Sequence, residues 1–289
     1  NGEVIPLAEI SDEIKFELNS NKSQSINRSF QFDKFPLTFS EYQQKFKIVH
    51  DNLLFGNSYL TNLTYPTKIS TNLSLDEIFE FSVAKYKLKY KEDFVCFSPE
   101  RFVKIENQFI FSNPMKGTID ASIKNAEHVI LEDKKEKAEH ATIVDLIRND
   151  LSLVAENVEV TNYRYIDEVK TNDKTLLQVS SEIRGKLNDD YIQNLGTIFD
   201  QLLPAGSICG APKKKTVEII LEAEKYNRNF YTGVFGVFDG ENLDSAVMIR
   251  FIENNQGELF FKSGGGVTAK SDVKAEYEEL IQKVYVPIY

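Results

Sequence analysis

A short predicted hairpin brings a carboxylate and a lysine towards the same place. Apolar strands are predicted at 102–105 and 109–111, turned at 106–107, with Glu100 just before the first strand and Lys116 shortly after the second. Because paired strands return their flanks to each other, Glu100 and Lys116 are expected to face one site. Lys116 stands between an apolar residue and a glycine, where a lysine can lose hydration and act as a nucleophile. The commoner alternative is a solvated surface lysine.

Two pairs of glutamates form a second chemical pattern. Glu136 and Glu139 lie three residues apart on one predicted helix, and Glu276 and Glu279 are spaced likewise on another. Each pair lies beside the apolar face of its helix, so the two pairs can approach each other inside the protein. Four such carboxylates are tolerable together only with a cation among them. All-oxygen ligands favour Mg²⁺ over Zn²⁺. Glutamate pairs on solvated helices are the alternative.

Composition limits the ligand classes. The chain has 289 residues, 42% of them hydrophobic and 27% charged, with a net charge of −10. This acidic balance argues against nucleic acid and anionic membrane surfaces as partners. An anionic substrate would therefore need local positive charge or a bound cation. No apolar run reaches the roughly 18 residues of a membrane span. No signal peptide is visible, and two cysteines without metal or redox spacing favour a reduced, cytoplasmic setting.

Periodicity and capping residues predict one compact domain that mixes helices and strands. Ser40, Ser74 and Ser271-Asp272 are interpreted as helix N-caps, and Pro212 as the start of a helix after a glycine-rich turn. Helices are predicted at 40–54, 75–89, 132–151, 190–203, after 212 and at 272–284. Further strands are predicted at 58–70, 157–169, 175–187, 233–240, 245–254 and 258–267.

Two features of the C-terminal strands suggest ligand contacts. Arg250 lies inside an apolar strand, where a charge is costly without an anionic partner. The run Gly264-Gly265-Gly266 lets backbone approach a ligand closely.

The motifs occur in an order that resembles a known family. They read SPERF, NPMKGT, EDKKEKAEHATIVDLIRNDL, GSICGAPK, YTGVFG, MIRF, SGGGV and AEYEELIQK. Together they are similar to the chorismate-utilising enzymes, which include anthranilate synthase component I, the isochorismate and salicylate synthases, and aminodeoxychorismate synthase component I. The resemblance is strongest over 40–289. It implies that 1–289 forms a single chorismate-binding catalytic domain. It implies stacked, largely antiparallel sheets flanked by helices, with the site between them.

The resemblance also implies roles for individual residues. Mg²⁺ would bridge a substrate carboxylate to Glu139 and Glu279, with Glu136 and Glu276 nearby. Glu100 would be the general acid for a departing ring hydroxyl. The implied substrate contacts are Thr118, Lys213, Tyr231, Arg250, Gly264, Gly265, Gly266 and Lys283.

Lys116 and Leu60 point to one branch of the family. Aminodeoxychorismate synthases typically carry a lysine at the position of Lys116, which is thought to attack the ring covalently, whereas the other branches usually have a small residue. Hydroxylating members carry a water-activating lysine where this chain has Leu60. The expected activity is amination of chorismate at C4, with ammonia from a separate glutaminase subunit, on the route to p-aminobenzoate and folate. The alternatives are anthranilate synthase component I, isochorismate synthase and, more remotely, a non-catalytic binding protein.

Three residues depart from the pattern of the family, and the pKa of Lys116 is also expected to be shifted. Ala205 and Cys209 replace a usual glycine and threonine, and Gln178 stands where many relatives have histidine. The pKa of Lys116 is expected below its ordinary value, because burial and Mg²⁺ disfavour the ammonium form, with carboxylates partly opposing them.

Overall fold

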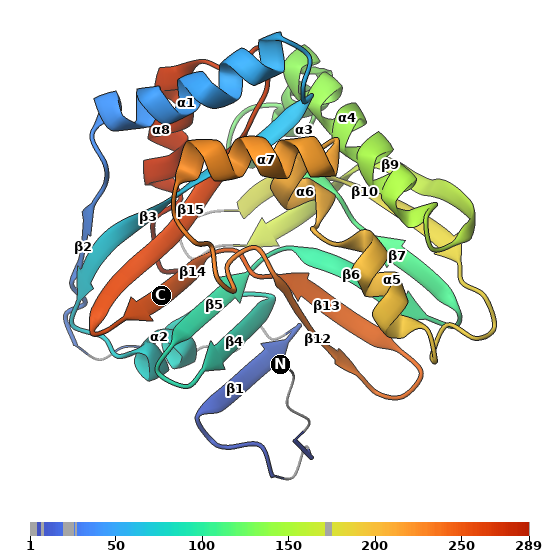
Figure 1. Ribbon diagram of the computed structural model, residues 1–289, viewed down its shortest axis with the longest axis horizontal. Coiled ribbons are helices and arrows are strands. Elements are labelled where there is room, and N and C mark those ends of the chain that lie inside the picture. The colour runs from blue at the N-terminus through green and yellow to red at the C-terminus, as the bar shows by residue number, and fades with distance from the viewer. Residues whose placement is uncertain (1–4, 7–8, 20–25, 27, 171–174, 289) are drawn as a thin grey trace.

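The computed structural model describes residues 5–6, 9–19, 26, 28–170 and 175–288. Two antiparallel sheets form its framework, with helices packed on them (Figure 1). This agrees with the expected mixed architecture of stacked, largely antiparallel sheets flanked by helices.

The first sheet runs in the order β1-β4-β5-β14-β15-β3-β11, with β2 also paired to β3. Its strands are β1 (Ile14–Leu18), β2 (Phe32–Phe35), β3 (Leu60–Thr71), β4 (Tyr86–Tyr90), β5 (Phe94–Ser98), β11 (Gly210–Ala211), β14 (Phe251–Asn255) and β15 (Glu258–Val267). Its long central pair places Asn62 opposite Gly266 and Thr64 opposite Gly264. The glycine run is therefore held directly beside the start of β3.

The second sheet runs in the order β12-β13-β6-β7-β10-β8, with β9 also paired to β10. Its strands are β6 (Arg101–Glu106), β7 (Phe109–Ser112), β8 (Met115–Asp120), β9 (Glu156–Lys170), β10 (Thr175–Lys186), β12 (Val234–Phe238) and β13 (Leu243–Val247). The predicted β6–β7 hairpin is present, but its turn lies one residue later than expected. Asn107 and Gln108 both adopt positive φ values, of 50° and 65°.

Eight helices cover the sheets in the described part of the chain, and four of them begin at a capping side chain. They are α1 (Phe39–Leu54), α2 (Leu75–Phe81), α3 (Ala126–Glu132), α4 (Lys134–Leu151), α5 (Leu195–Leu202), α6 (Gly206–Cys209), α7 (Lys213–Glu224) and α8 (Val273–Gln282). Asp133 caps α4 and Asp272 caps α8 through backbone N–H groups, which orients the two glutamate pairs. For α1 the cap is Thr38, in a reciprocal pair with Glu41, and the expectation of Ser40 is wrong.

The helices divide between the sheets. Figure 1 shows α1, α7 and α8 grouped over β3 and β15, and their apolar faces share one core with those strands. Helix α4 packs instead on β8, β9 and β10 of the second sheet. Each glutamate pair therefore lies on a helix that packs against a different sheet.

Two segments differ from prediction because the chain changes partners. The helix expected at 75–89 ends at Phe81, and Tyr86–Tyr90 forms β4 between β1 and β5. The strand expected at 245–254 breaks into β13 and β14, which belong to different sheets. Arg250 lies at this break with φ 55°, so it is not inside a strand as expected.

The chain also crosses between sheets from β5 to β6, and the two crossings lie side by side. Val247 N–H donates to Glu100 O at 3.2 Å, and Phe97 N–H donates to Arg250 O at 3.1 Å. Glu100 and Arg250 thus occupy neighbouring links between the two sheets.

Candidate active site

A cavity of about 830 Å³ opens where the two sheets meet. Its wall combines β3 and β15 of the first sheet with β8 and β10 of the second, together with α4, α6 and both crossings. Among the predicted site residues, the wall contains Glu100, Lys116, Glu139, Tyr231, Arg250, Gly264, Gly265, Gly266 and Lys283.

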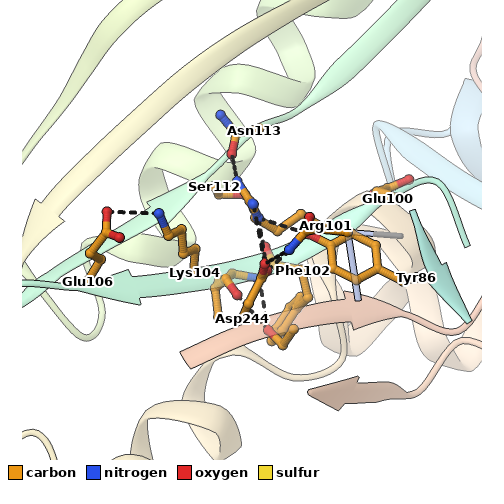
Figure 2. Close-up of polar contacts among 12 residues, drawn as sticks. Tyr86, Glu100, Arg101, Phe102, Lys104, Glu106, Ser112, Asn113 and Asp244 are labelled. Carbon is orange, nitrogen blue, oxygen red and sulfur yellow. Dashed lines mark hydrogen bonds and ion pairs between the residues drawn. The ribbon is translucent and has the colours of Figure 1, made fainter. Parts of the chain in front are cut away.

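Arg101 fixes the base of the β6–β7 hairpin between Glu100 and Lys116. Its guanidinium donates to Asn113 Oδ1 at 3.0 Å, to Asp244 Oδ1 at 3.1 Å and to the Tyr86 hydroxyl at 3.0 Å (Figure 2). Asn113 lies on the far flank, immediately before the Pro114-Met115 segment. The structure therefore brings Glu100 and Lys116 to one cavity, as the hairpin pattern predicts.

The surroundings of Glu100 raise the pKa of its carboxyl group above the ordinary value. Burial raises the pKa of Glu100, while a hydrogen bond from Ser207 and the charges of Lys283 and Arg250 oppose this rise without cancelling it. The Ser207 hydroxyl donates to Glu100 Oε1 at 2.8 Å and fixes the orientation of the carboxyl group. Such a group can give a proton to a leaving oxygen.

Lys116 points towards the glutamates of α4. Its Nζ lies 2.9 Å from Glu139 Oε2, and its side chain is 38% exposed, on the cavity side. Burial lowers the pKa of Lys116, but the charges of Glu139, Glu279 and Glu136 raise it by more than burial lowers it. The net direction is upward, so the expectation of a lowered pKa is wrong for the chain's own residues.

Of the four predicted glutamates Glu139 lines the cavity, and the other three lie against the backbone of Gly117 or Gly265. A Cβ on Gly265 would lie 3.2 Å from Glu276 Oε2 and 3.4 Å from Glu279 Oε1. A Cβ on Gly117 would lie 2.9 Å from Glu136 Oε2. Any larger residue at these two positions would therefore crowd a carboxylate.

The pKa values of these glutamates shift in different directions. Burial raises the pKa of Glu136 and of Glu276. Burial also acts on Glu279, but Lys283, with Nζ 2.6 Å away, outweighs it and the pKa of Glu279 falls. Lys116 and Lys283 thus neutralise one glutamate of each pair.

The carboxylates suit a hard divalent cation in chemical type. Glu136 Oε2 is buried without a hydrogen-bond partner, which marks it as an available ligand atom. In the part of the chain that the structure describes, no three Asp, Glu, His or Cys side chains are close enough to hold an ion unaided. Mg²⁺ commonly binds through one or two carboxylates, with substrate and water completing its shell. The residues present fit that mode.

Cationic and backbone groups also line the wall. Lys283 Nζ donates to Gly264 O at 2.9 Å, and Arg250 Nη1 donates to Lys283 O at 3.4 Å. Tyr231 is 4% exposed and lies in the same wall. This arrangement offers donors to carboxylate groups of a ligand.

Thr118 and Lys213 lie outside the cavity wall. Thr118 is exposed on β8, beside Gln178 of β10. Lys213 Nζ binds Asp150 Oδ2 at 3.0 Å and Leu202 O at 2.6 Å, so it joins α7 to α4 and to the end of α5. The structure thus gives Lys213 a structural role in place of the expected substrate contact.

Several wall residues were not singled out by the sequence. Ser207 lies within the GSICGAPK motif, so that motif could have identified it, although its partner Glu100 is 107 residues away. Lys262 is 1% exposed and pairs with Glu253 at 2.9 Å, which no local pattern indicates. Asn62, two residues after Leu60, and Gln178, already noted as a departure from many relatives, also border the cavity.

The family model for chorismate binding enzymes matches residues 6–288. The chain belongs to this family. The resemblance inferred from the ordered motifs is therefore confirmed.

Relatives within the family differ in what they are said to do. An uncharacterized PabA-like protein of Pasteurella multocida is 51% identical over 291 residues, covering 99% of this chain and 90% of the relative. Aminodeoxychorismate synthase component 1 of Bacillus subtilis is 30% identical over 266 residues, covering 86% of this chain but 55% of that enzyme.

A solved structure has the same fold. Anthranilate synthase component I from Streptococcus pneumoniae superposes with a TM-score of 0.74 at 22% identity, over 90% of this chain and 60% of that one. This likeness supports the fold assignment alone. Within the described residues, no helix is long and apolar enough to cross a membrane.

Proposed function

We propose that this chorismate binding enzyme aminates chorismate at C4, as an aminodeoxychorismate synthase component I. The observation that carries the proposal is Lys116, whose Nζ enters the cavity 2.9 Å from Glu139 while Glu100 borders the same cavity. Leu60, also in the wall, has no group that could activate water. We infer that 1–289 acts as a single catalytic domain in the cytoplasm.

The chemistry follows from these two side chains. The ammonium of Lys116 first loses a proton to solvent. Its free amine then forms a bond to C2 of the ring as the C4–O bond breaks, and Glu100 gives its proton to the departing hydroxyl, which leaves as water. Ammonia then forms the C4–N bond as the C2–Nζ bond breaks, which restores Lys116. The sum is chorismate plus ammonia giving 4-amino-4-deoxychorismate plus water.

Substrate binding would use the remaining wall. Arg250, Lys283 and the Gly264–Gly266 backbone would hold carboxylates, and Tyr231 would pack beside the ring. Mg²⁺, held by Glu139 and Glu279 with Glu136 and Glu276 behind them, would neutralise a substrate carboxylate among these glutamates. Local cations in an acidic protein thereby accommodate a dianion.

Ammonia would come from a glutaminase subunit, as the PabA-like description of the Pasteurella relative suggests. The deciding experiment incubates the pure chain with chorismate, Mg²⁺ and ammonium and identifies the products by mass. We expect 4-amino-4-deoxychorismate with pyruvate retained. Release of pyruvate with anthranilate would indicate anthranilate synthase, a hydroxylated isomer would indicate isochorismate synthase, and no product would favour a binding protein.

A further inference from the structure

Asn62 borders the cavity and carries a buried acceptor atom. It lies near the start of β3, and both Leu60 and Asn62 border the cavity, whereas Leu63 packs into the core beneath α1, α7 and α8. Asn62 Oδ1 is buried and accepts no hydrogen bond. Among the described residues of the cavity wall, it is the only fully buried side-chain polar atom without a partner.

The surroundings of Asn62 are firmly held. Its backbone oxygen accepts a hydrogen bond of 2.9 Å from Arg228 Nη2, and Arg228 is paired with buried Glu224. The next residue on the same strand face, Thr64, is committed to Glu224 through its hydroxyl and its N–H. Buried acceptors are almost always paired, so an orphaned one on a rigid strand indicates a ligand.

The chemistry of the atom restricts that ligand. The nearby cations Lys116, Arg250 and Lys283 supply donors for anionic groups, whereas Asn62 Oδ1 can only accept an N–H or O–H. A carboxamide oxygen accepts an N–H from ammonium as well as from ammonia, so the acceptor alone does not choose between them. Leu60 lies beside it on the same face and reaches within 3.0 Å of where a Gly266 Cβ would stand. Apolar contact disfavours a charged guest.

We propose that Asn62 Oδ1 is the acceptor of the ammonia subsite. This inference rests on the proposed amination. An N–H of ammonia donates to Oδ1, which leaves the nitrogen lone pair available to form the C4–N bond as the bond from C2 to Lys116 breaks. The surplus proton on the new amine passes to the Glu100 carboxylate formed in the first displacement. Ammonium has no lone pair and cannot form the C4–N bond until it loses a proton, which the apolar contact with Leu60 favours.

Steady-state kinetics of Asn62→Leu, with Mg²⁺ and saturating chorismate, test the subsite. We expect the KM for ammonium to rise about tenfold, the order expected for one lost hydrogen bond in a closed site. The Kd of chorismate, measured by calorimetry, should stay within about twofold because the carboxylate contacts remain. Asn149→Leu is the matched control, since Asn149 is exposed on α4 and bonds only to Asp145.

Asn62→Asp keeps the shape and guards against a folding defect in the leucine variant. Its carboxylate should retain ammonium, so turnover at neutral pH should fall and recover as the pH is raised. An unchanged ammonium KM in a folded Asn62→Leu protein would overturn the subsite, as would a chorismate Kd that rises equally, because Oδ1 would then receive the substrate hydroxyl. If the wild type forms no C4-amino product, the proposed function itself fails.

Discussion

Arg101 Nη1 lies 3.0 Å from Asn113 Oδ1, and this bond closes the base of the β6–β7 hairpin. Arg101 directly follows Glu100, and Asn113 precedes Lys116 by three residues. The bond therefore sets the spacing between the proposed acid and the proposed nucleophile. Asp244, which also accepts from Arg101, anchors the same side chain to β13 (Figure 2).

Asn113→Ala should reduce both stability and turnover. The partly buried Arg101 donor loses its acceptor, at a cost of about 1–3 kcal/mol in the free energy of unfolding. Urea unfolding with chorismate turnover measures both effects. Lys104→Ala on β6 is the control, because its ion pair with Glu106 is solvated and worth less than about 1 kcal/mol. Equal losses in both variants would contradict a special role for the Arg101–Asn113 bond.

Glu100→Gln should slow turnover about a hundredfold while leaving the chorismate Kd near normal, because only the transferable proton is lost. In the wild type the protonated form is the active one. Since burial raises the pKa of Glu100, activity should be present below that raised pKa and fall as the pH rises through it. The variant should lack this alkaline limb. Glu106→Gln, at the exposed end of the same strand, should keep both rate and limb; a limb that survives Glu100→Gln would place the acid elsewhere.

Lys116→Ala should abolish most C4 amination and direct any residual chemistry to C2. The reason is that direct displacement at C4 lacks the covalent step. Denaturing mass spectrometry of wild type quenched with chorismate, without ammonia, should reveal an adduct on the Lys116 peptide. Lys137→Ala, which removes an exposed lysine paired with Glu132, should retain the adduct. Unchanged rate and product in Lys116→Ala would refute covalent catalysis.

Chelation should abolish turnover, and Glu139→Gln or Glu279→Gln should weaken Mg²⁺ binding measured by calorimetry in the presence of chorismate. Each substitution removes one of the proposed Mg²⁺ ligands. Without the ion, the remaining glutamates would repel the substrate carboxylate. Glu278→Gln makes the same charge change on exposed surface of α8 and should bind Mg²⁺ normally. Full activity in excess chelator would exclude a metal requirement.

Local sequence signals located the hairpin and the glutamate helices because their causes are local. Asp272 caps α8 through N–H groups two and three residues later, so its side chain alone marks where the helix begins. Spacing then places Glu276 and Glu279 on one face. The helix start at Ser74 was predicted for the same reason, with Glu77 completing its capping box.

The predictions that failed concern segments whose structure depends on residues far away in the sequence. Lys87 and Lys89 fall at the end of the helix expected over 75–89, yet both are almost fully buried in β4, where Glu17 and Asp76 neutralise them. The mostly apolar segment at 245–254, which also contains Arg250, gave no sign that β13 and β14 pair in different sheets. Likewise Ser207 meets Glu100 only through the tertiary fold, so its role could not be read from a neighbouring residue.

The two adjacent sheet crossings have a consequence for the evolution of this chain. Surface connections normally tolerate insertions and changes in length. Here Glu100 and Arg250 stand on the connections themselves, which are bonded to each other through Val247 and Phe97. One added residue in either link would shift a functional group as well as the alignment of the sheets. We therefore expect length variation among homologues to avoid these links and to collect at outward turns such as the one around Gly240.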